Sequence, residues 1–238
     1  MGLYRERGIV LRTIKLGEAD RIVTLATEGR GKVRAVAKGV RKTKSRFGAR
    51  LEPTSHVAVL CWEGRELDVI NQAEAIDSFR TVREDLDRLG RAATLLEAVD
   101  LVVQERDENA RLYRMLLGAL RTLAAHDAPL MVPAFLWKLL AAEGFSPVVD
   151  MCVACGAEGD LVAFDLGEGG ALCVDCRRGL RVSPEALRLL RRILGGDLVA
   201  VLGEPASPAG HEVEHLGALA LENHVERRLR SIGVLNQG

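Results

Sequence analysis

The sequence predicts an α+β protein with a small five-stranded β-barrel over residues 1–78 and an α-helical domain over residues 79–238. Three observations support this organisation. Five short runs rich in β-branched residues occupy the first part of the chain, and apolar residues recur at helical spacing after it. Two Cys-x-x-Cys pairs interrupt the helical part, which predicts a metal module at residues 150–180.

The predicted strands are separated by turn signals rather than by helices. Their sequences are RGIVLRTIKL, RIVTLATE, KVRAVAKGV, HVAVLCWEG and ELDVINQAEAI, and the turns include GEAD, EGRG and EPTS. Five short strands within about 75 residues favour a closed or partly closed barrel, because a flat sheet would leave its edges open to other chains. An OB-type barrel matches this strand count, and an SH3-like barrel is the structural alternative.

The first helix of the second domain is predicted from apolar residues that recur at helical spacing after Ser78. This stripe consists of Leu86, Leu89, Ala93, Leu96 and Leu101, with charged residues between its members. The segments ENARLYRMLLGALRTLAA and LMVPAFLWKLLAAEG continue as helices. In the latter, Pro133 is expected in the first turn and Gly144 at the C-terminal cap.

Two more helices are predicted after the cysteine segment. Ser183 and Pro184 are expected to begin the first of them, as its N-cap and its first helical residue. The segment GEPASPAG is interpreted as a short linker. A last helix is expected from about Glu212 to Ser231.

The four cysteines of the insert follow the pattern C-x₂-C-x₁₇-C-x₂-C; they are Cys152, Cys155, Cys173 and Cys176. Two residues between the cysteines of a pair let both thiolates face one ion, and Gly156 permits a tight turn. The spacer is expected to fold as a hairpin, with LVAF and ALC as strands and DLGEGG as the turn. Four thiolates complete a closed tetrahedral shell, so we expect one structural Zn²⁺ ion. This spacing favours zinc over an iron–sulfur cluster or a redox-active pair.

A second metal-binding pattern is HEVEH, from His211 to His215. It matches H-E-x-x-H, in which two histidines bind zinc and the glutamate, here Glu212, acts as general base. A third ligand on a separate segment is lacking, since His224 and Glu226 belong to the same predicted helix. We interpret HEVEH as a polar helix face and keep a zinc-dependent hydrolase as the alternative function. No phosphate loop, dinucleotide fingerprint or nucleophile elbow occurs, so we expect no enzyme.

The net charge is zero, but basic residues are concentrated near the N-terminus. Residues 1–50 contain fourteen Lys or Arg and four Asp or Glu. Such a surplus predicts an anionic partner for the barrel. The sequence shows no leader pattern and no apolar run long enough to cross a bilayer, so we expect a soluble cytoplasmic protein with no membrane partner.

The basic surplus continues from the third predicted strand into the loop KGVRKTKSRFGAR, residues 38–50. Alternate residues of this strand are basic and share one face, while Val33, Ala35 and Ala37 point into the barrel. A basic strand face that leads into a basic loop is typical of a track for a phosphate backbone, and Phe47 could stack on a base.

We therefore predict a nucleic-acid interface that recognises the backbone rather than the base sequence. A solvated charge run is the alternative interpretation. The predicted binding residues are Arg30, Lys32, Arg34, Lys38, Arg41, Lys42, Lys44, Arg46 and Arg50.

The segment LGEADRIVTLATEGRGKVRAVAKGVRKTKSRFGARLEP resembles the N-terminal signature of the bacterial RecO family of DNA repair proteins. The likeness continues through the helical middle and the four-cysteine insert to the closing segment ENHVERRLRSIGVLN. It implies an OB-fold domain followed by a helical domain, often with a zinc module. The DNA-facing positions that it implies are Lys32, Arg34, Lys38, Arg41, Lys42, Lys44 and Arg46.

The resemblance also implies a function and partners. Proteins of this family bind single- and double-stranded DNA, anneal complementary strands, and act with RecR and the single-stranded DNA-binding protein SSB to help load RecA. RecA is therefore an indirect partner, and the expected location is the bacterial nucleoid. The resemblance does not include HEVEH.

Overall fold

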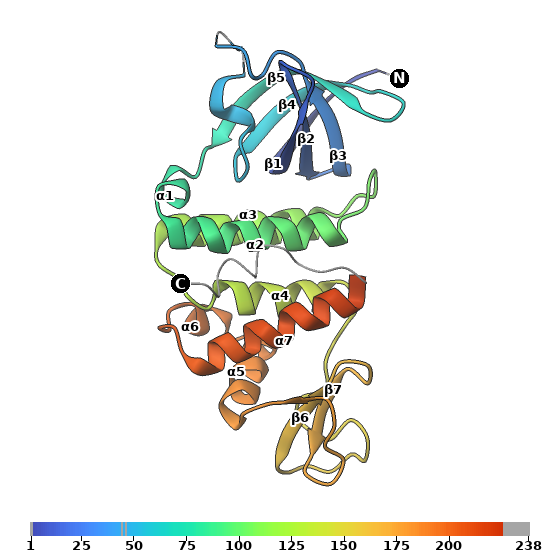
Figure 1. Cartoon of the computed structure of the whole chain (residues 1–238), viewed down its shortest axis with the longest axis vertical. Coiled ribbons are helices and arrows are strands. Elements are labelled where there is room, and N and C mark those ends of the chain that lie inside the picture. The colour runs from blue at the N-terminus through green and yellow to red at the C-terminus, as the bar shows by residue number, and fades with distance from the viewer. Residues whose placement is uncertain (1, 44, 46, 226–238) are drawn as a thin grey trace. The chain divides into compact units, whose positions relative to one another are not determined.

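A computed structural model describes residues 2–43, 45 and 47–225 of the chain (Figure 1). The chain divides into two compact units, Met1–His126 and Asp127–Gly238. Among the described residues, the first unit contains a five-stranded barrel, a short 3-10 helix and three α-helices, and the second contains four α-helices and a small sheet. The predicted α+β fold, with a barrel followed by helices, is confirmed. The predicted domain boundary at residue 78 stays a prediction, because the helices that follow it lie in the first unit.

The barrel closes in the strand order β1-β2-β3-β5-β4. Its strands are β1 (Leu3–Leu16), β2 (Asp20–Thr27), β3 (Gly31–Ala37), β4 (His56–Trp62) and β5 (Asp68–Asp77). The long strand β1 pairs antiparallel with both β2 and β4, and the short parallel pairing of β3 with β5 closes the barrel. This is the OB-type barrel that the strand count predicts.

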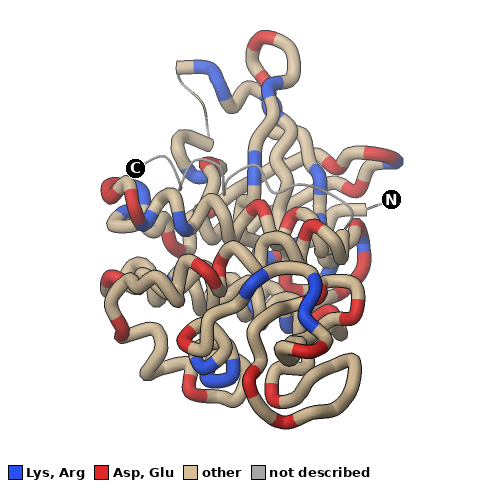
Figure 2. The backbone as a smooth tube through the Cα atoms, turned by 60° about the horizontal axis from the view of Figure 1, so that its bottom comes forward, with Lys and Arg blue, Asp and Glu red and all other residues tan. Residues whose placement is uncertain are grey.

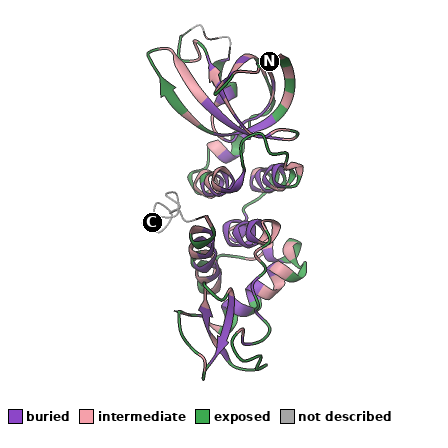
Figure 3. Cartoon of the chain, turned by 90° about the vertical axis from the view of Figure 1, so that its right-hand side faces the viewer, coloured by how far each residue is buried: buried purple, intermediate pink, exposed green. Residues whose placement is uncertain are grey.

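The barrel core consists mostly of aliphatic residues, and buried positions alternate with less buried ones along strands such as β3. Figure 3 colours the buried residues purple. Val33, Ala35 and Ala37 of β3 point into this core, as the sequence predicts. Phe47 also lies in the core, where it is 1% exposed. The prediction that Phe47 stacks on a base is therefore wrong. Its ring packs in the barrel beside Leu51 of the short helix η1 (Gly48–Leu51), because burying a large apolar ring is favourable.

The helices of the first unit are α1 (Arg80–Arg83), α2 (Leu86–Val102) and α3 (Ala110–Ala125). The side chains of Asp85 and Asn109 cap α2 and α3 by accepting bonds from Arg88 N (3.0 Å) and Leu112 N (3.1 Å). Helices α2 and α3 lie side by side (Figure 1).

The helix predicted after Ser78 is present as α2, but of the five apolar residues that predicted it only Leu96 is buried. Leu86 is 84% exposed and Ala93 is exposed, while Leu89 and Leu101 are half-buried. The buried side is formed by Ala92, Leu95, Leu96, Ala98, Val99 and Val102. The difference arises because α2 packs against β1 as well as against α1 and α3, so more than one side of the helix is covered.

A polar contact joins the barrel to α3. His56, on β4, is 4% exposed, and its Nε2 lies 2.7 Å from the hydroxyl of Tyr113 on α3. The Nδ1 atom of His56 is buried without a hydrogen-bond partner. Burial therefore lowers the pKa of His56 below its usual value, since a charged imidazole would be poorly solvated there.

The helices of the second unit are α4 (Met131–Ala142), α5 (Pro184–Gly195), α6 (Leu198–Leu202) and α7 (Pro208–Val225). Its sheet has the order β7-β6-β8, formed by β6 (Leu161–Asp165), β7 (Gly170–Cys173) and β8 (Leu180–Arg181). Trp137 of α4 is fully buried and donates a hydrogen bond from Nε1 to the carbonyl of Val213 on α7, at 2.9 Å. Gly217 allows this close packing, because a Cβ there would lie 3.0 Å from Trp137 Nε1.

The predicted helix boundaries hold for α4 and α5 and differ for α7. Gly144 follows α4 with φ +89°, and Ser183 caps α5 by accepting a bond from Ala186 N at 3.1 Å. Helix α7 begins at Pro208, within the predicted linker, because Ser207 accepts a bond from Gly210 N. Residues 226–231 of the predicted last helix lie outside the described residues. Within the described part of the chain, no helix is long and apolar enough to cross a membrane.

Acidification is expected to weaken the first unit. The unfolded chain protonates His56 near pH 6.5, whereas burial and the charge of Arg121 keep the folded form neutral to lower pH, with Asp77 and Glu28 partly opposing them. The free energy of unfolding should therefore fall as the pH drops below about 6.5. Denaturant titrations at pH 7.5 and 5.5 test this. His56→Gln keeps an amide group that can bond to the hydroxyl of Tyr113 but cannot be protonated in this range. Its free energy of unfolding should therefore fall less between pH 7.5 and 5.5 than that of the wild type. An equal fall would show that His56 is not the group responsible.

Candidate metal centre and nucleic-acid interface

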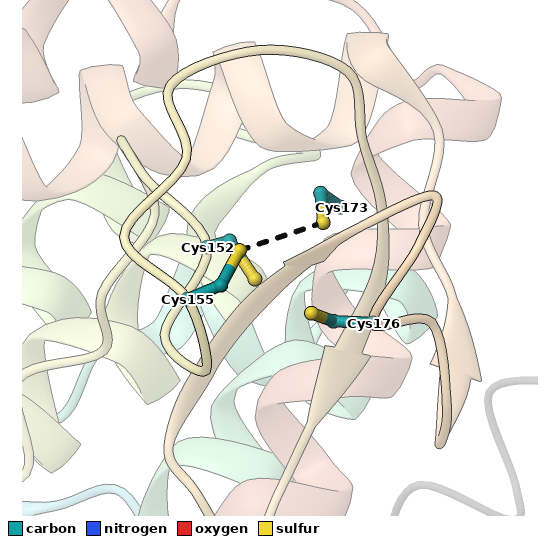
Figure 4. Close-up of side chains that lie close together, drawn as sticks. All are labelled: Cys152, Cys155, Cys173 and Cys176. Carbon is teal, nitrogen blue, oxygen red and sulfur yellow. Dashed lines mark hydrogen bonds between the residues drawn. The ribbon is translucent and has the colours of Figure 1, made fainter.

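The four predicted metal ligands meet in the second unit. The Sγ atoms of Cys152, Cys155, Cys173 and Cys176 all lie within 4.8 Å of one another (Figure 4). Cys152 and Cys155 precede β6, Cys173 ends β7, and Cys176 lies in the turn beyond it. The predicted hairpin of β6 and β7 therefore brings the second pair of cysteines to the first.

The spacing of the sulfur atoms matches a tetrahedral metal site. The Sγ atoms of Cys155 and Cys173 are 3.8 Å apart. Four thiolates at about 2.3 Å from a tetrahedral ion would lie about 3.8 Å from one another. The cysteines form no disulfide. They could therefore hold a metal ion with four sulfur ligands.

Glycines and a carboxylate shape the backbone around the cysteines. Gly156 has φ +74° and donates its N–H to the carbonyl of Cys152 at 2.8 Å, which turns the chain back after the first pair. Gly179 has the same φ beyond the second pair. In the hairpin turn, Asp165 Oδ1 accepts bonds from Gly167 N (2.9 Å) and Glu168 N (3.0 Å). The cluster is thus fixed by local backbone geometry.

Hydrogen bonds within the cluster shift the pKa values of Cys152 and Cys176 in opposite directions. A hydrogen bond from the backbone of Cys173 lowers the pKa of Cys152 to about 6, which favours its thiolate form. Hydrogen bonds with Cys155 and Cys173 raise the pKa of Cys176 to about 12. A metal ion bound by these sulfurs would favour their thiolate forms, because its positive charge compensates theirs.

The residues of the HEVEH motif do not point to a common site: its two histidines are exposed, and its first glutamate makes a structural contact. His211 and His215 are exposed on α7. Glu212 accepts bonds from both the N–H and the hydroxyl of Ser183, each at 2.6 Å, and Ser183 caps α5. Within residues 2–43, 45 and 47–225, the four cysteines are the one group of three or more potential metal ligands that lie together.

Two of the predicted nucleic-acid-binding residues, Lys32 and Arg34, lie on β3, and a third, Arg30, lies just before it; each of the three is paired with a carboxylate. Lys32 Nζ lies 3.1 Å from Asp100 Oδ1, and its side chain is 15% exposed. Arg34 lies 3.3 Å from Glu105. Arg30, just before β3, lies 3.4 Å from Glu63 and stacks 4.0 Å above the ring of Tyr4. The carboxylate partners Glu63, Asp100 and Glu105 come from other segments of the chain, and Figure 2 shows acidic and basic positions distributed over the whole backbone.

The predicted loop between β3 and β4 displays its cations to solvent. Lys38, Arg41, Lys42 and Arg50 are exposed. The guanidinium of Arg41 donates to the carbonyl of Gly17 at 3.2 Å, which directs it along the rim of the barrel. Two further predicted residues, Lys44 and Arg46, lie outside the described residues.

Sequence reasoning missed the acidic partners and one further cation. Asp100 pairs with Lys32 and also with Arg12, at 2.5 Å, and it lies 68 residues after Lys32. Arg106 joins Arg30, Lys32 and Arg34 around a small hollow. These residues carry no local signal, because the fold alone brings the end of α2 to the edge of β3.

Glu212→Ala is expected to destabilise the second unit by about 1–3 kcal/mol, because it removes two charge-assisted hydrogen bonds to Ser183. His215→Ala, at an exposed position, is the matched control and should change stability by less than about 0.5 kcal/mol. Denaturant unfolding measures both. A larger effect of His215→Ala would indicate that the histidine has a role which its exposure does not explain.

Replacing Cys152 and Cys173 by Ser is expected to abolish metal binding and to lower the melting temperature of the second unit, because metal binding is coupled to folding. Elemental analysis of the purified protein and thermal unfolding give the two readouts. His211→Ala with His215→Ala is the control and should keep the metal. Unchanged metal content in the cysteine variant would show that the ion binds elsewhere.

Two family models and several relatives match the chain. The model of the Recombination protein O N terminal matches residues 1–79, and that of the C terminal matches residues 83–232. The DNA repair protein RecO of Frankia casuarinae is 42% identical over 243 residues, which cover 100% of both chains. The protein of the same name from Nocardioides sp. is 43% identical over 245 residues, 99% of this chain and 100% of the relative. That of Streptomyces coelicolor is 44% identical over 245 residues, 98% of each chain. The chain therefore belongs to the RecO family.

Proposed function

We propose that this protein is a DNA repair and recombination mediator that binds single- and double-stranded DNA and anneals complementary strands. The observation that carries this proposal is the exposed set Lys38, Arg41, Lys42 and Arg50, which lies on one loop of an OB-type barrel without an acidic residue in residues 38–50. Membership of the RecO family supports the same function.

The interface acts through charge. Each Lys or Arg that neutralises a phosphate releases condensed counterions, so binding falls steeply as salt increases. The exposed loop cations meet DNA first, because Lys32 and Arg34 of β3 are already paired with Asp100 and Glu105. Two strands held on positive surfaces repel each other less and can then pair. No covalent bond changes in annealing, so the proposed mechanism needs no catalytic residue.

The metal is proposed to be a single structural Zn²⁺. The donor set fits this ion, since four thiolates form the closed tetrahedral shell of structural zinc sites. Zinc bound there would cross-link the two cysteine pairs and fix the hairpin of β6 and β7. The four cysteines do no more than bind the ion and orient this small sheet.

The partners are proposed on the basis of the family. The helices are the proposed docking surface for RecR and SSB, through which the protein would help to load RecA at the bacterial nucleoid. The zinc-hydrolase alternative has no support from the geometry of HEVEH, because Glu212, the residue that would act as the base, binds Ser183.

Reversal of Lys42, Lys44 and Arg46 to Glu is expected to weaken DNA binding. In a plot of the logarithm of the DNA association constant against the logarithm of the salt concentration, the negative slope should become shallower by about one for each lost phosphate contact. Fluorescence anisotropy with single- and double-stranded oligonucleotides at several salt concentrations measures both quantities. The control variant reverses Arg111, Arg114 and Arg121, which are exposed on α3 and give the same change in net charge. Unchanged affinity of the loop variant at low salt would refute the proposed interface.

A further inference from the structure

A small hollow lies where β3, the turn between β4 and β5, and the segment between α2 and α3 meet in the first unit. Its volume is about 110 Å³. Because a water molecule occupies about 30 Å³ in the liquid, this volume could hold three or four waters. The hollow is therefore large enough for one tetrahedral oxyanion and too small for a nucleotide, whose sites are several times larger.

Four cations line the hollow; they are Arg30, Lys32, Arg34 and Arg106. The first three come from β3 and the turn before it, while Arg106 comes from the segment after α2. Lys32 uses two of its three ammonium donors on Asp100, through the carboxylate at 3.1 Å and the backbone carbonyl at 2.5 Å. Arg106 donates to the carbonyl of Gly64 at 3.1 Å, which holds its guanidinium against the neighbouring turn.

The carboxylates that line the hollow differ in how strongly they are held by hydrogen bonds and ion pairs. Asp68 accepts hydrogen bonds from the hydroxyl of Tyr4 and from Gly64 N, so its carboxylate is held by contacts within the barrel. Glu66 is exposed. Glu105 pairs with Arg34 at 3.3 Å, and half of its side chain is exposed. Exposed ion pairs of this length contribute little to stability, so an incoming anion can replace Glu105 beside Arg34.

The backbone around Arg106 is held in a strained and closely packed arrangement. Arg106 has φ +60°, which a residue with a side chain rarely adopts. Lys32 N donates to the carbonyl of Gln104 at 2.9 Å, and Arg106 N donates to the carbonyl of Lys32 at 3.3 Å. A Cβ at Gly31 would lie 1.9 Å from the carbonyl of Asp107. Strain of this kind persists where the surroundings fix the residue, and here it directs Arg106 into the hollow.

We propose that this hollow is a binding site for a terminal phosphate group of a nucleic-acid strand, held by Arg30, Lys32, Arg34 and Arg106. The inference rests on the proposed DNA-binding function and adds to it a preference for phosphorylated strand ends. Guanidinium groups match the planar pairs of oxygens that a phosphate presents, and Lys32 contributes a point charge.

Charge and size favour a terminal phosphate over one within a strand. A phosphomonoester carries between about −1.5 and −2 charges at neutral pH, whereas a backbone phosphodiester carries one. The monoester therefore gains more from these cations when Arg30 and Arg34 exchange the carboxylates of Glu63 and Glu105 for phosphate oxygens. It also has a single chain attached, so it can enter a hollow that has no room for flanking nucleotides. Inorganic phosphate shares this chemistry and is the alternative source of the ligand.

The test compares oligonucleotides of one sequence that carry a phosphate at the 5′ end, at the 3′ end or at neither end. Fluorescence anisotropy of an internally labelled strand should show about threefold to tenfold tighter binding for a phosphorylated end. Arg106→Gln should remove this preference, and Glu105→Gln should enlarge it. Arg65→Gln is the matched control, because it removes an exposed positive charge from the neighbouring turn without lining the hollow. Melting temperatures verify that the variants are folded.

The outcomes separate this inference from the function on which it rests. Equal affinity for all three strands, or an equal effect of Arg106→Gln and Arg65→Gln, would overturn the terminal-phosphate site while leaving DNA binding in place. Stabilisation of the protein by inorganic phosphate, without any preference for phosphorylated ends, would assign the hollow to free phosphate and also overturn it. Failure to bind any of the strands would overturn both the inference and the proposed function.

Discussion

The fold of the first unit depends on closure of the barrel by the parallel pairing of β3 with β5. This contact joins Ala35 to Asp68 and Val36 to Val69. Because it is short, much of the energy that keeps the barrel closed comes from the apolar core, including Phe47 and the inward residues of β3. Closure also fixes the outer face of β3. The basic residues there are then presented at a defined edge, beside the segment that follows α2.

The same closure explains why the cations of the first unit fall into two sets. Those of β3 lie against the end of α2, where Asp100 and Glu105 neutralise them. Those of the loop between β3 and β4 extend beyond the barrel, and Lys38 and Lys42 are exposed. In the proposed function, the loop cations would make the first contact with a phosphate backbone, while the β3 cations would form the more enclosed site proposed for a terminal phosphate. Burial of Phe47 connects the two sets, because it anchors the basic loop in the barrel core.

Local patterns predicted the strands, the helix caps and the cysteine pairs, because each depends on residues that are close in sequence. Ser183 and Gly144 are examples, since a cap needs only the adjacent turn. Long-range contacts could not be predicted in this way. The pair of Lys32 and Asp100 spans 68 residues, and the covered sides of α2 depend on where β1 and α3 pack. Phe47 was misassigned because a loop position does not reveal whether an aromatic ring turns inward.

The HEVEH segment illustrates the limit of a short motif. Its letters match a zinc-binding pattern, but Glu212 is bound to Ser183 and the histidines face solvent. The cysteine pattern, in contrast, is supported by backbone turns that bring the four sulfurs together. In the proposed function, the barrel would bind DNA and the helices would bind proteins, while a metal held by the four cysteines would stabilise the second unit.

The most direct test of the central claim is strand annealing. Complementary oligonucleotides coated with SSB and labelled with a fluorescent pair would be mixed with the protein in the absence of nucleotide. The account predicts rapid annealing by the wild type and loss of annealing when the basic loop is reversed in charge. DNA binding without annealing by the wild type, or undiminished annealing by the loop variant, would contradict it.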